Sequence, residues 1–423
     1  MKHIPQSMHF FLTTFGSSGD VFPMLGLAAE LKRNGHHVTL ATNEYYSELA
    51  ASCGVPFVPV GSREGFNECI RHPNLWKPAK AFGHIFGWIQ KALKQQYLEV
   101  LKAAESTPDV VTVSNCLSFG ALFAQETHRI PNITVHLQPT VIFSRHEPPV
   151  FPGIFGPRWL RTLIYRMGTR FVIDPIACPF LNSWRTELGL GPVTRITERW
   201  HSPSGVVCMF PEWFAKPQAD WPRPLVQTDF PLWNYQKHTE LPDALDQFLS
   251  HGPAPVVFTA GSTNVHAAQF FKTALEACET LGIRCVLVTE FPEQLPAAPL
   301  PSWAFHCEYA PFSQLLPRAS VFVHHGGIGS MSQGFAAGIP QIVMPLAHDQ
   351  FDNAARLENL DSGFSLPVRK FTKSNLSDRL NKLLTIPRFS QSASEISARL
   401  QSGGLQQSAI AVEELALRAR ELT

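Results

Sequence analysis

The stretch Val323-His324-His325-Gly326-Gly327-Ile328-Gly329-Ser330 decides the fold of this chain. Its apolar start is typical of a buried strand, its glycines predict a tight turn, and a helix is expected to begin near Ser330. Glycines let backbone N–H groups approach a ligand, and the start of a helix favours negative charge. The stretch therefore predicts a diphosphate site with His325 and Ser330 as further donors, although a plain strand-to-helix turn with packed histidines would have the same pattern.

Strands alternate with helices on both sides of this turn. In the second half we expect strands at residues 256–259, 285–289, 304–309, 321–324 and 341–344, and a helix near 267–281. In the first half we expect strands at 8–15, 37–42, 57–60, 110–114 and 133–137, and a helix at 22–33. Such alternation predicts an α/β protein with two Rossmann-like, doubly wound parallel-sheet domains that face each other across a cleft.

A stretch rich in proline and tryptophan, around residues 210–242, marks the boundary between the two domains because it shows little periodicity. We expect an N-terminal domain at 1–215, a linker at 216–245, a C-terminal domain at 246–400, and a last helix at 401–423 that packs back on the N-terminal domain. The length of 423 residues agrees with two domains, since single cores stop growing at about 250–300 residues.

Composition excludes several classes of protein. The chain has 35 basic and 34 acidic residues, and no basic run that would attract nucleic acid. Its eight cysteines form no Cys-x-x-Cys pair, so neither a disulfide framework nor a zinc site is indicated. The apolar run at residues 8–15 is too short for a membrane span and lacks a cleavage-like site. We therefore expect a cytoplasmic protein, with peripheral contact to the inner face of the membrane as an alternative.

Further residues extend the first motif, and together they resemble the family 1 glycosyltransferases of GT-B architecture. The match runs from Tyr309 to Ala354 and includes Gly338-Ile339-Pro340 and His348-Asp349-Gln350-Phe351-Asp352-Asn353. The resemblance implies that His325, Gly327, Gly329 and Ser330 hold the diphosphate of a nucleotide sugar, together with Ser262 and Thr263. It also implies that Asp349 and Gln350 bind sugar hydroxyls; helix capping is the alternative role for Asp349.

Two positions depart from the family pattern. Members that use UDP-sugars commonly carry a glutamate where this chain has Gln333, and that glutamate grips both ribose hydroxyls. Because a deoxyribose lacks one of these hydroxyls, Gln333 favours a dTDP-sugar as donor, while a UDP-sugar stays open. Tyr309 stands where the family places an aromatic residue near the base, but the usual glutamine is replaced by Phe312, so we expect a different base pocket.

The motif Gly16-Ser17-Ser18-Gly19-Asp20-Val21-Phe22-Pro23 supplies the expected catalytic residue. Attack of a hydroxyl on an anomeric carbon needs a base, and in bacterial members that this chain resembles, the matching aspartate is that base. We therefore assign this role to Asp20, with helix N-capping as the structural alternative. By chemistry alone His128, His136 and His201 are also candidates.

No metal ion and no cofactor are expected beyond the donor substrate. The chain lacks an Asp-x-Asp motif, which in the other large glycosyltransferase architecture positions a divalent cation on the diphosphate. The start of the helix after Gly329 and the side chain of His325 would do the work of that cation.

The acceptor side of the sequence is apolar. We expect Trp76, Phe82 and Phe86 to contact a hydrophobic acceptor, although a plain core helix would look the same. The segment 158–172 has helical apolar spacing with four arginines and no acid. Such a helix can lie on an anionic membrane or hold an acidic lipid headgroup, but a solvated arginine face over the core has the same pattern.

Segments at residues 201–208, 210–214 and 220–222 are similar to the rhamnosyltransferases that form mono-rhamnolipids. This resemblance implies an inverting transfer of L-rhamnose from dTDP-L-rhamnose to a 3-(3-hydroxyalkanoyloxy)alkanoic acid, with an acyl-supplying enzyme as a partner. The alternatives are a UDP-glucose-dependent transferase acting on a sterol or polyketide, and an epimerase, hydrolase or non-catalytic binder of the same architecture. The sequence argues against a dinucleotide-dependent oxidoreductase, since the first turn lacks Gly-x-Gly-x-x-Gly and no second glycine fingerprint occurs.

Overall fold

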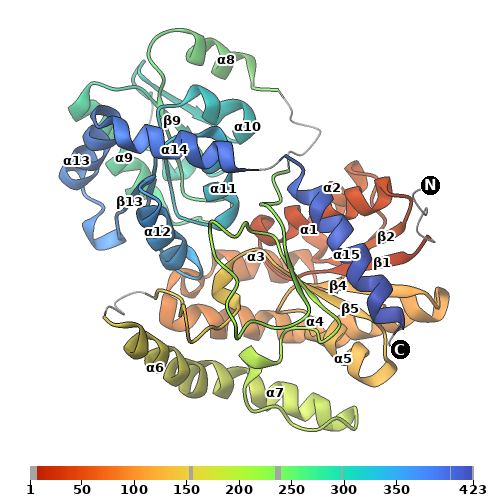
Figure 1. Ribbon diagram of the computed structural model, residues 1–423. Coiled ribbons are helices and arrows are strands. Elements are labelled where there is room, and N and C mark those ends of the chain that lie inside the picture. Colours follow the sequence, from red (N-terminus) through yellow and green to blue (C-terminus); the bar gives the residue numbers. More distant parts are fainter. Residues whose placement is uncertain (1–6, 152–155, 234–239, 297–298, 401, 422–423) are drawn as a thin grey trace. The chain divides into compact units, whose positions relative to one another are not determined.

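The computed structural model describes residues 7–151, 156–233, 240–296, 299–400 and 402–421 (Figure 1). The chain forms two compact units. The N-terminal unit contains Met1–Leu75, Ala79–Trp233 and Ser402–Thr423, and the C-terminal unit contains Trp76–Pro78 and Asn234–Gln401. Each unit is built around one parallel sheet, so the expected α/β class with two Rossmann-like domains is confirmed.

The sheet of the N-terminal unit has seven strands in the order β3-β2-β1-β4-β5-β6-β7, all of them parallel. The strands are β1 His9–Thr13, β2 His37–Thr42, β3 Phe57–Pro59, β4 Val110–Ser114, β5 Asn132–His136, β6 Val206–Cys208 and β7 Leu225–Gln227. The helices are α1 Ser18–Arg33, α2 Ser47–Ser52, α3 Arg63–Arg71, α4 Pro78–Ser106, α5 Phe119–His128, α6 Arg158–Gly168, α7 Asp174–Glu187 and α15 Gly404–Glu421.

The sheet of the C-terminal unit has six parallel strands in the order β10-β9-β8-β11-β12-β13. The strands are β8 Val256–Thr259, β9 Cys285–Val288, β10 Ala304–Cys307, β11 Val321–His324, β12 Gln341–Val343 and β13 Gly363–Ser365. The helices are α8 Asp243–Ser250, α9 Ala268–Leu281, α10 Phe312–Leu315, α11 Ile328–Ala337, α12 Gln350–Asn359, α13 Lys373–Thr385 and α14 Pro387–Arg399.

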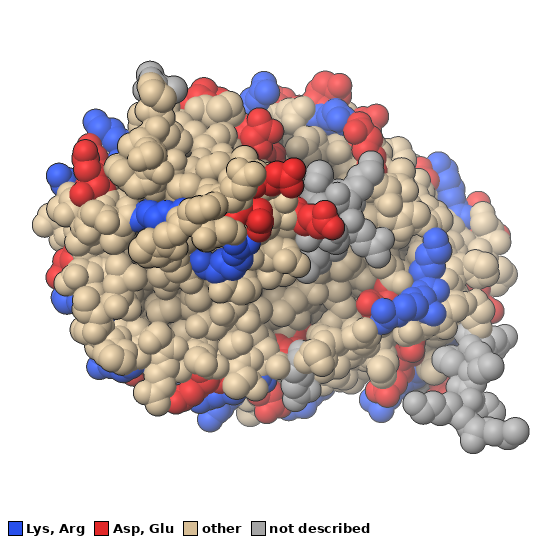
Figure 2. All heavy atoms as spheres, turned by 90° about the horizontal axis from the view of Figure 1, so that it is seen from above, with Lys and Arg blue, Asp and Glu red and all other residues tan. Residues whose placement is uncertain are grey.

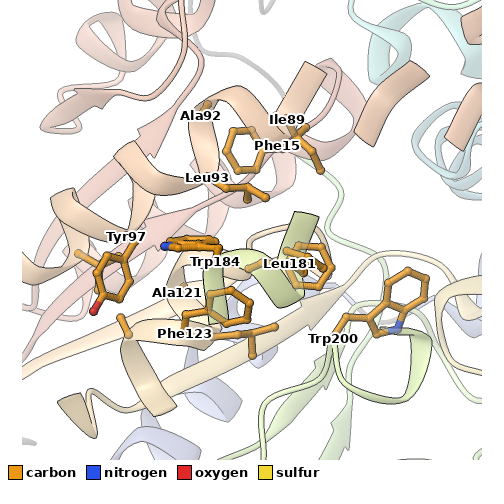
Figure 3. Close-up of a cluster of buried hydrophobic side chains, with 14 of the residues drawn as sticks. Phe15, Ile89, Ala92, Leu93, Tyr97, Ala121, Phe123, Leu181, Trp184 and Trp200 are labelled. Carbon is orange, nitrogen blue, oxygen red and sulfur yellow. The ribbon is translucent and has the colours of Figure 1, made fainter. Parts of the chain in front are cut away.

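Aromatic side chains fill the core between the first sheet and helices α4, α5 and α7 (Figure 3). Trp184 of α7 contacts Phe123 of α5, with ring centroids 4.7 Å apart, and Tyr97 of α4 at 5.7 Å. Burying an aromatic side chain of this size contributes about 1.5–3 kcal/mol, so this cluster holds α7 firmly against the unit. The C-terminal unit has its own core, in which Phe270 of α9 stacks on Phe371.

The last helix, α15, packs on α1 and on the inner strands β5 and β6 of the N-terminal sheet. Asn34, at the end of α1, donates a hydrogen bond to the Glu413 carboxylate at 2.7 Å, and the His36 ring lies 3.2 Å from the same carboxylate. The hydroxyl groups of Thr228 and Ser408 form a hydrogen bond of 2.8 Å. The C-terminal end of the chain is therefore part of the N-terminal unit.

Element boundaries differ from the sequence expectations at short strands and helix starts. β6, β7 and β13 were not expected, and β7 lies within the stretch assigned to the linker, so the N-terminal unit extends further along the chain than residue 215. Residues 234–239 of that stretch lie outside the described residues. Helix α1 begins at Ser18 and α11 at Ile328, earlier than expected in both cases. Among the described residues, no helix is both long and apolar enough to cross a membrane.

Candidate functional site

The glycine turn lies at the point of the C-terminal sheet where the strand order reverses, between β8 and β11. Register pairs Thr259 with His324, and His324 with Val343, so the three strands end at the same edge of the sheet. The turns that follow them therefore meet there. Open α/β sheets bind ligands at this switch point, outside the carboxyl ends of the strands.

The two neighbouring histidines of the turn have different roles. His324 is fully buried, and its Nδ1 accepts a hydrogen bond from Gly326 N at 3.0 Å. Its Nε2 must then carry the proton and donate to Gln341 Oε1 at 2.8 Å. Burial lowers the pKa of His324 to about 3, so the ring is neutral. His324 fixes the shape of the turn and is not available to a ligand.

His325 is held against two glycines. A Cβ atom on Gly327 would lie 2.5 Å from its Nε2, and one on Gly261 would lie 2.8 Å from its Cε1. Burial, and then the neighbouring His348, lower the pKa of His325 to about 4, so the imidazole is neutral near pH 7. Gly261 also has a φ of +93°, which favours glycine. The glycine at these two positions therefore allows the ring to reach the edge of the sheet.

The start of α11 offers backbone donors beside this ring. The first helical hydrogen bond runs from Met331 N to Gly327 O at 3.0 Å, so the N–H groups of Ile328, Gly329 and Ser330 precede the helical ladder. Gly329 is exposed, and a Cβ atom on it would meet nothing within 4 Å. The backbone donors and the helix dipole at the start of α11 are suited to a phosphate.

Gln333 lies one turn further along α11 and is half-buried. Because residues three apart share a helix face, Gln333 and Ser330 lie on the same side of α11. Ser262, in the turn after β8, is exposed, and Thr263 beside it is buried. The predicted diphosphate residues of both turns thus follow strands that end at the same edge.

Asp349 and Gln350 lie at the start of α12. Asp349 occupies the N-cap position but makes no side-chain cap bond, and its Oδ2 accepts from Asn353 Nδ2 at 2.6 Å. Gln350 is buried, and its Oε1 accepts from the N–H groups of Leu346 at 2.7 Å and Ala347 at 3.1 Å. The Gln350 oxygen therefore fixes the preceding turn, which leaves its amide NH2 for the predicted contact with a sugar hydroxyl.

Asn353 was missed by the sequence reasoning, although it lies within the matched motif. It is fully buried, and its Nδ2 donates to Gly326 O at 3.0 Å as well as to Asp349. It thereby ties α12 to the glycine turn. The spacing of four residues from Asp349 to Asn353 is the signal that would have found this pair.

The residues expected near the base follow β10. Tyr309 is exposed to 37%. Phe312, by contrast, packs on Phe322 with ring centroids 5.2 Å apart and is part of a hydrophobic cluster of the unit. Burial, and then the nearby Glu308, raise the pKa of Glu290, which follows β9. Glu290 and Glu308 were not among the sequence candidates.

In the N-terminal unit, Asp20 lies in the first turn of α1 and Ser17 is the N-cap residue. Asp20 Oδ2 accepts from Ser17 N at 2.9 Å and from Ser17 Oγ at 3.4 Å. Burial raises the pKa of Asp20 from 3.8 to about 6, and the bonds from Ser17 oppose that rise. A Cβ atom on Gly16 would lie 2.1 Å from Asp20 Oδ2, and the φ of Gly16 is +146°. Asp20 thus takes part in capping and also has the pKa of a base that works near neutral pH.

Asp20 follows β1, beside β4, where the order of the N-terminal sheet reverses. Asn115 follows β4 and donates through Nδ2 to Phe15 O at 2.7 Å, which joins the two turns. Burial, and then the charge of Asp20, raise the pKa of the Cys116 thiol to about 12, so it stays protonated. Asp20 is therefore surrounded by neutral groups on this side.

The three histidine candidates have other surroundings. His136 Nε2 and His201 Nδ1 are 2.8 Å apart. Burial holds the pKa of His136 well below its usual range and lowers that of His201 to about 4, so both rings are neutral. His128 lines a hollow of about 550 Å³ together with Asp109 and Val110, at the amino end of β4. That is the edge of the sheet opposite to Asp20.

The predicted acceptor residues are divided between core and surface. Phe86 is 1% exposed and packs on Phe119 and Phe180. Phe82 stacks on Phe86 from the edge of this cluster and is only partly buried, and Trp76 is half-buried. Of the three residues, Trp76 and Phe82 therefore keep surface that an acceptor can reach.

Two family models match the chain. Residues 10–142 match the glycosyltransferase family 28 N-terminal domain, and residues 285–408 match the erythromycin biosynthesis protein CIII-like C-terminal domain. The fold and these two matches define the class. The chain is a glycosyltransferase of the GT-B type, with a family 28-like N-terminal half and an erythromycin CIII-like C-terminal half.

Curated relatives and solved structures agree with this class. The chain is 25% identical to the O-mycaminosyltylonolide 6-deoxyallosyltransferase of Streptomyces fradiae, over 97% of this chain and 98% of the relative. It is 24% identical to a sterol 3-beta-glucosyltransferase of Vanderwaltozyma polyspora, over 90% of this chain but only 32% of that longer protein.

Among solved structures, the kitacinnamycin glycotransferase matches with a TM-score of 0.75 and 20% identity, over 97% of this chain and 100% of that one. The spinosyn rhamnosyltransferase SpnG complexed with thymidine diphosphate matches with a TM-score of 0.66 and 17% identity, over 96% of this chain and 100% of that one. Because these identities are low, the structural likeness establishes the fold.

Proposed function

We propose that the protein is an inverting, metal-independent glycosyltransferase that moves a deoxy-sugar from a nucleoside diphosphate to the hydroxyl of a hydrophobic acceptor. The observation that carries this proposal is the turn after β11, where the N–H groups that precede the first hydrogen bond of α11 follow Gly327, beside which the neutral His325 ring lies. A second observation supports the proposal. The carboxyl group of Asp20, at the switch point of the N-terminal sheet, has a pKa of about 6.

In this mechanism Asp20 accepts the proton of the acceptor hydroxyl while the hydroxyl oxygen bonds to the anomeric carbon. The bond between that carbon and the diphosphate oxygen breaks, and its electron pair leaves with the diphosphate. The N–H groups of Gly329 and Ser330, together with His325, stabilise the charge that develops there. Attack opposite to the leaving group inverts the anomeric configuration.

For the donor we propose dTDP-L-rhamnose. Gln333 lacks the carboxylate that would grip two ribose hydroxyls, which favours a deoxyribose. The solved spinosyn rhamnosyltransferase carries thymidine diphosphate and shares this fold. Tyr309, partly exposed after β10, is the proposed aromatic neighbour of the thymine ring.

For the acceptor we propose a 3-(3-hydroxyalkanoyloxy)alkanoic acid, which gives a mono-rhamnolipid-type glycolipid. Trp76 and Phe82 are the proposed contacts for its acyl chains, and an enzyme that supplies this acid stays a predicted partner. The second candidate is a UDP-glucose-dependent transfer to a sterol or polyketide. The name of the curated sterol 3-beta-glucosyltransferase favours this glucose transfer, whereas the name of the O-mycaminosyltylonolide 6-deoxyallosyltransferase favours a deoxy-sugar.

Competitive titration of dTDP and UDP tests the donor. One lost hydrogen bond to a hydroxyl changes affinity by about 1 kcal/mol, so dTDP should bind about fivefold more tightly than UDP. In Gln333→Glu the difference in affinity between dTDP and UDP should become smaller or change sign. Gln391→Glu on the exposed face of α14 serves as the control. If the wild type binds UDP as tightly as dTDP or more tightly, the proposed donor becomes a UDP-sugar, and the transferase assignment is unaffected.

A further inference from the structure

Helix α6 carries large apolar side chains on its exposed face. Trp159 is 67% exposed, Leu163 48%, Met167 51% and Phe171 66%. These residues follow each other at intervals of four, so they form one stripe along α6 and the π-helical turn Thr169–Ile173 that joins α6 to α7. Single exposed apolar residues are ordinary, whereas a contiguous stripe marks an interaction surface.

The stripe is not the side by which α6 packs on its own unit. That side carries Leu160, Ile164 and Tyr165, and the Tyr165 ring stacks on Phe143 with centroids 4.5 Å apart. The helix therefore has two apolar faces, one of which is covered by the protein. Apolar side chains are exposed together with the arginines.

Positive charge borders the stripe. Arg158, Arg166 and Arg170 are exposed, and no acidic residue occurs from Arg158 to Ile173. In the part of the chain that the structure describes, none of these arginines forms an ion pair. The next acid, Asp174, is buried and accepts a hydrogen bond from Ile196 N at 3.1 Å. All charged side chains from Arg158 to Ile173 are therefore positive.

This local pattern is unusual for the molecule. On another face, Lys, Arg, Asp and Glu side chains are scattered among uncharged residues with both signs present (Figure 2). The whole chain has nearly equal numbers of basic and acidic residues. A concentration of one sign beside an aromatic and aliphatic stripe is thus a feature of α6 and not of the overall composition.

We propose that the exposed face of α6, defined by Trp159, Leu163, Arg166, Met167, Arg170 and Phe171, docks on the surface of a bilayer that contains anionic phospholipids. Tryptophan and phenylalanine insert at the boundary between headgroups and acyl chains, while the arginines bind lipid phosphates. A second copy of this chain is a poorer partner, because a two-fold interface would place the same unpaired arginines opposite one another. This inference does not rest on the proposed donor or acceptor.

Flotation with vesicles tests the proposal without any substrate. The probes are vesicles of phosphatidylcholine alone and of phosphatidylcholine with 30 mol% phosphatidylglycerol. The wild type should float with the anionic vesicles and much less with the neutral ones. Because each basic residue near an anionic surface contributes about fivefold to binding, Arg166→Glu/Arg170→Glu should weaken partitioning by at least about 25-fold. Trp159→Ala/Phe171→Ala should weaken it by about tenfold or more.

The matched control is Arg388→Glu/Arg399→Glu, which reverses two exposed arginines on α14 and should float like the wild type. All of the exchanged side chains are exposed, so thermal midpoints should stay within about 2 °C of the wild type. Equal flotation with both kinds of vesicle, or unchanged binding of the α6 variants, would overturn the proposal. A dimer in light scattering that the α6 variants dissociate, without vesicle binding, would assign the face to self-association instead. A failed sugar-transfer assay would not affect the flotation result.

Discussion

Exchange of Asp20 for asparagine should stabilise the protein while it abolishes the proposed base. The Asp20 carboxyl is held in surroundings that raise its pKa from 3.8 to about 6. One pKa unit corresponds to about 1.36 kcal/mol, so the ionised carboxylate costs the folded chain at most about 3 kcal/mol above pH 6. Partial exposure of the side chain reduces this figure. Asparagine keeps an oxygen that can accept from Ser17 N and carries no charge.

The sign of the pH dependence follows from proton binding. Below about pH 4 the carboxyl is protonated in both the folded and the unfolded chain, and it adds no difference. Between about pH 4 and pH 6 the folded chain binds more protons than the unfolded chain, so the free energy of unfolding falls as pH rises. Above pH 6 this loss is complete. In Asp20→Asn it should be absent.

Thermal unfolding of wild type and Asp20→Asn between pH 4.5 and pH 8 measures this difference. The variant should gain up to about 6–12 °C over the wild type at pH 8, and the gain should shrink toward pH 4.5. Asp243→Asn, at an exposed position on α8, is the matched control and should show no such trend. A constant difference between wild type and Asp20→Asn across this pH range would refute the raised pKa, and with it the physical basis for Asp20 as the base.

Two further exchanges probe the C-terminal unit. His325→Ala should weaken binding of bare dTDP about tenfold, since a hydrogen bond to phosphate is lost. The control His251→Ala, at an exposed position, should leave this binding unchanged. Equal dissociation constants of wild type and His325→Ala by calorimetry would count against the phosphate site. Gly363→Ala places a Cβ atom 1.9 Å from Gln341 O and should destabilise the unit by about 2–4 kcal/mol in denaturant unfolding. Gly87→Ala, with nothing within 4 Å, should be neutral or stabilising, and a similar loss in both glycine variants would contradict the steric argument.

The strands whose bounds the sequence predicted have four to six residues. Residues 37–42, 110–114, 256–259 and 321–324 form strands with the expected bounds, because continuous runs of β-branched and aromatic residues between turns leave no other assignment. β6, β7 and β13 have three residues each. Segments of three residues are too short to show the alternation of apolar and polar residues that marks a strand. They are recognised as strands only because they pair with a neighbouring strand.

The candidate site was predictable as a set of positions, but not as a set of orientations. The family resemblance pointed to His325, whereas only the three-dimensional structure shows that the neighbouring His324 ring bonds Gln341. In the same way, the sequence could not tell that the Gln350 oxygen is used by the preceding turn. Helix α6 gives a third example, because apolar residues on both of its faces leave the packed side undetermined in the sequence.

The most direct test of the account is acceptor-dependent release of nucleoside diphosphate by the purified protein in the presence of EDTA. With dTDP-L-rhamnose and a 3-(3-hydroxyalkanoyloxy)alkanoic acid, the wild type should release dTDP and form a glycolipid with inverted anomeric configuration, detected by mass spectrometry and NMR. Asp20→Asn should bind dTDP normally and turn over at least about a hundredfold more slowly. Release of dTDP without acceptor, return of an epimerised donor, or a wild-type rate in Asp20→Asn would contradict the account.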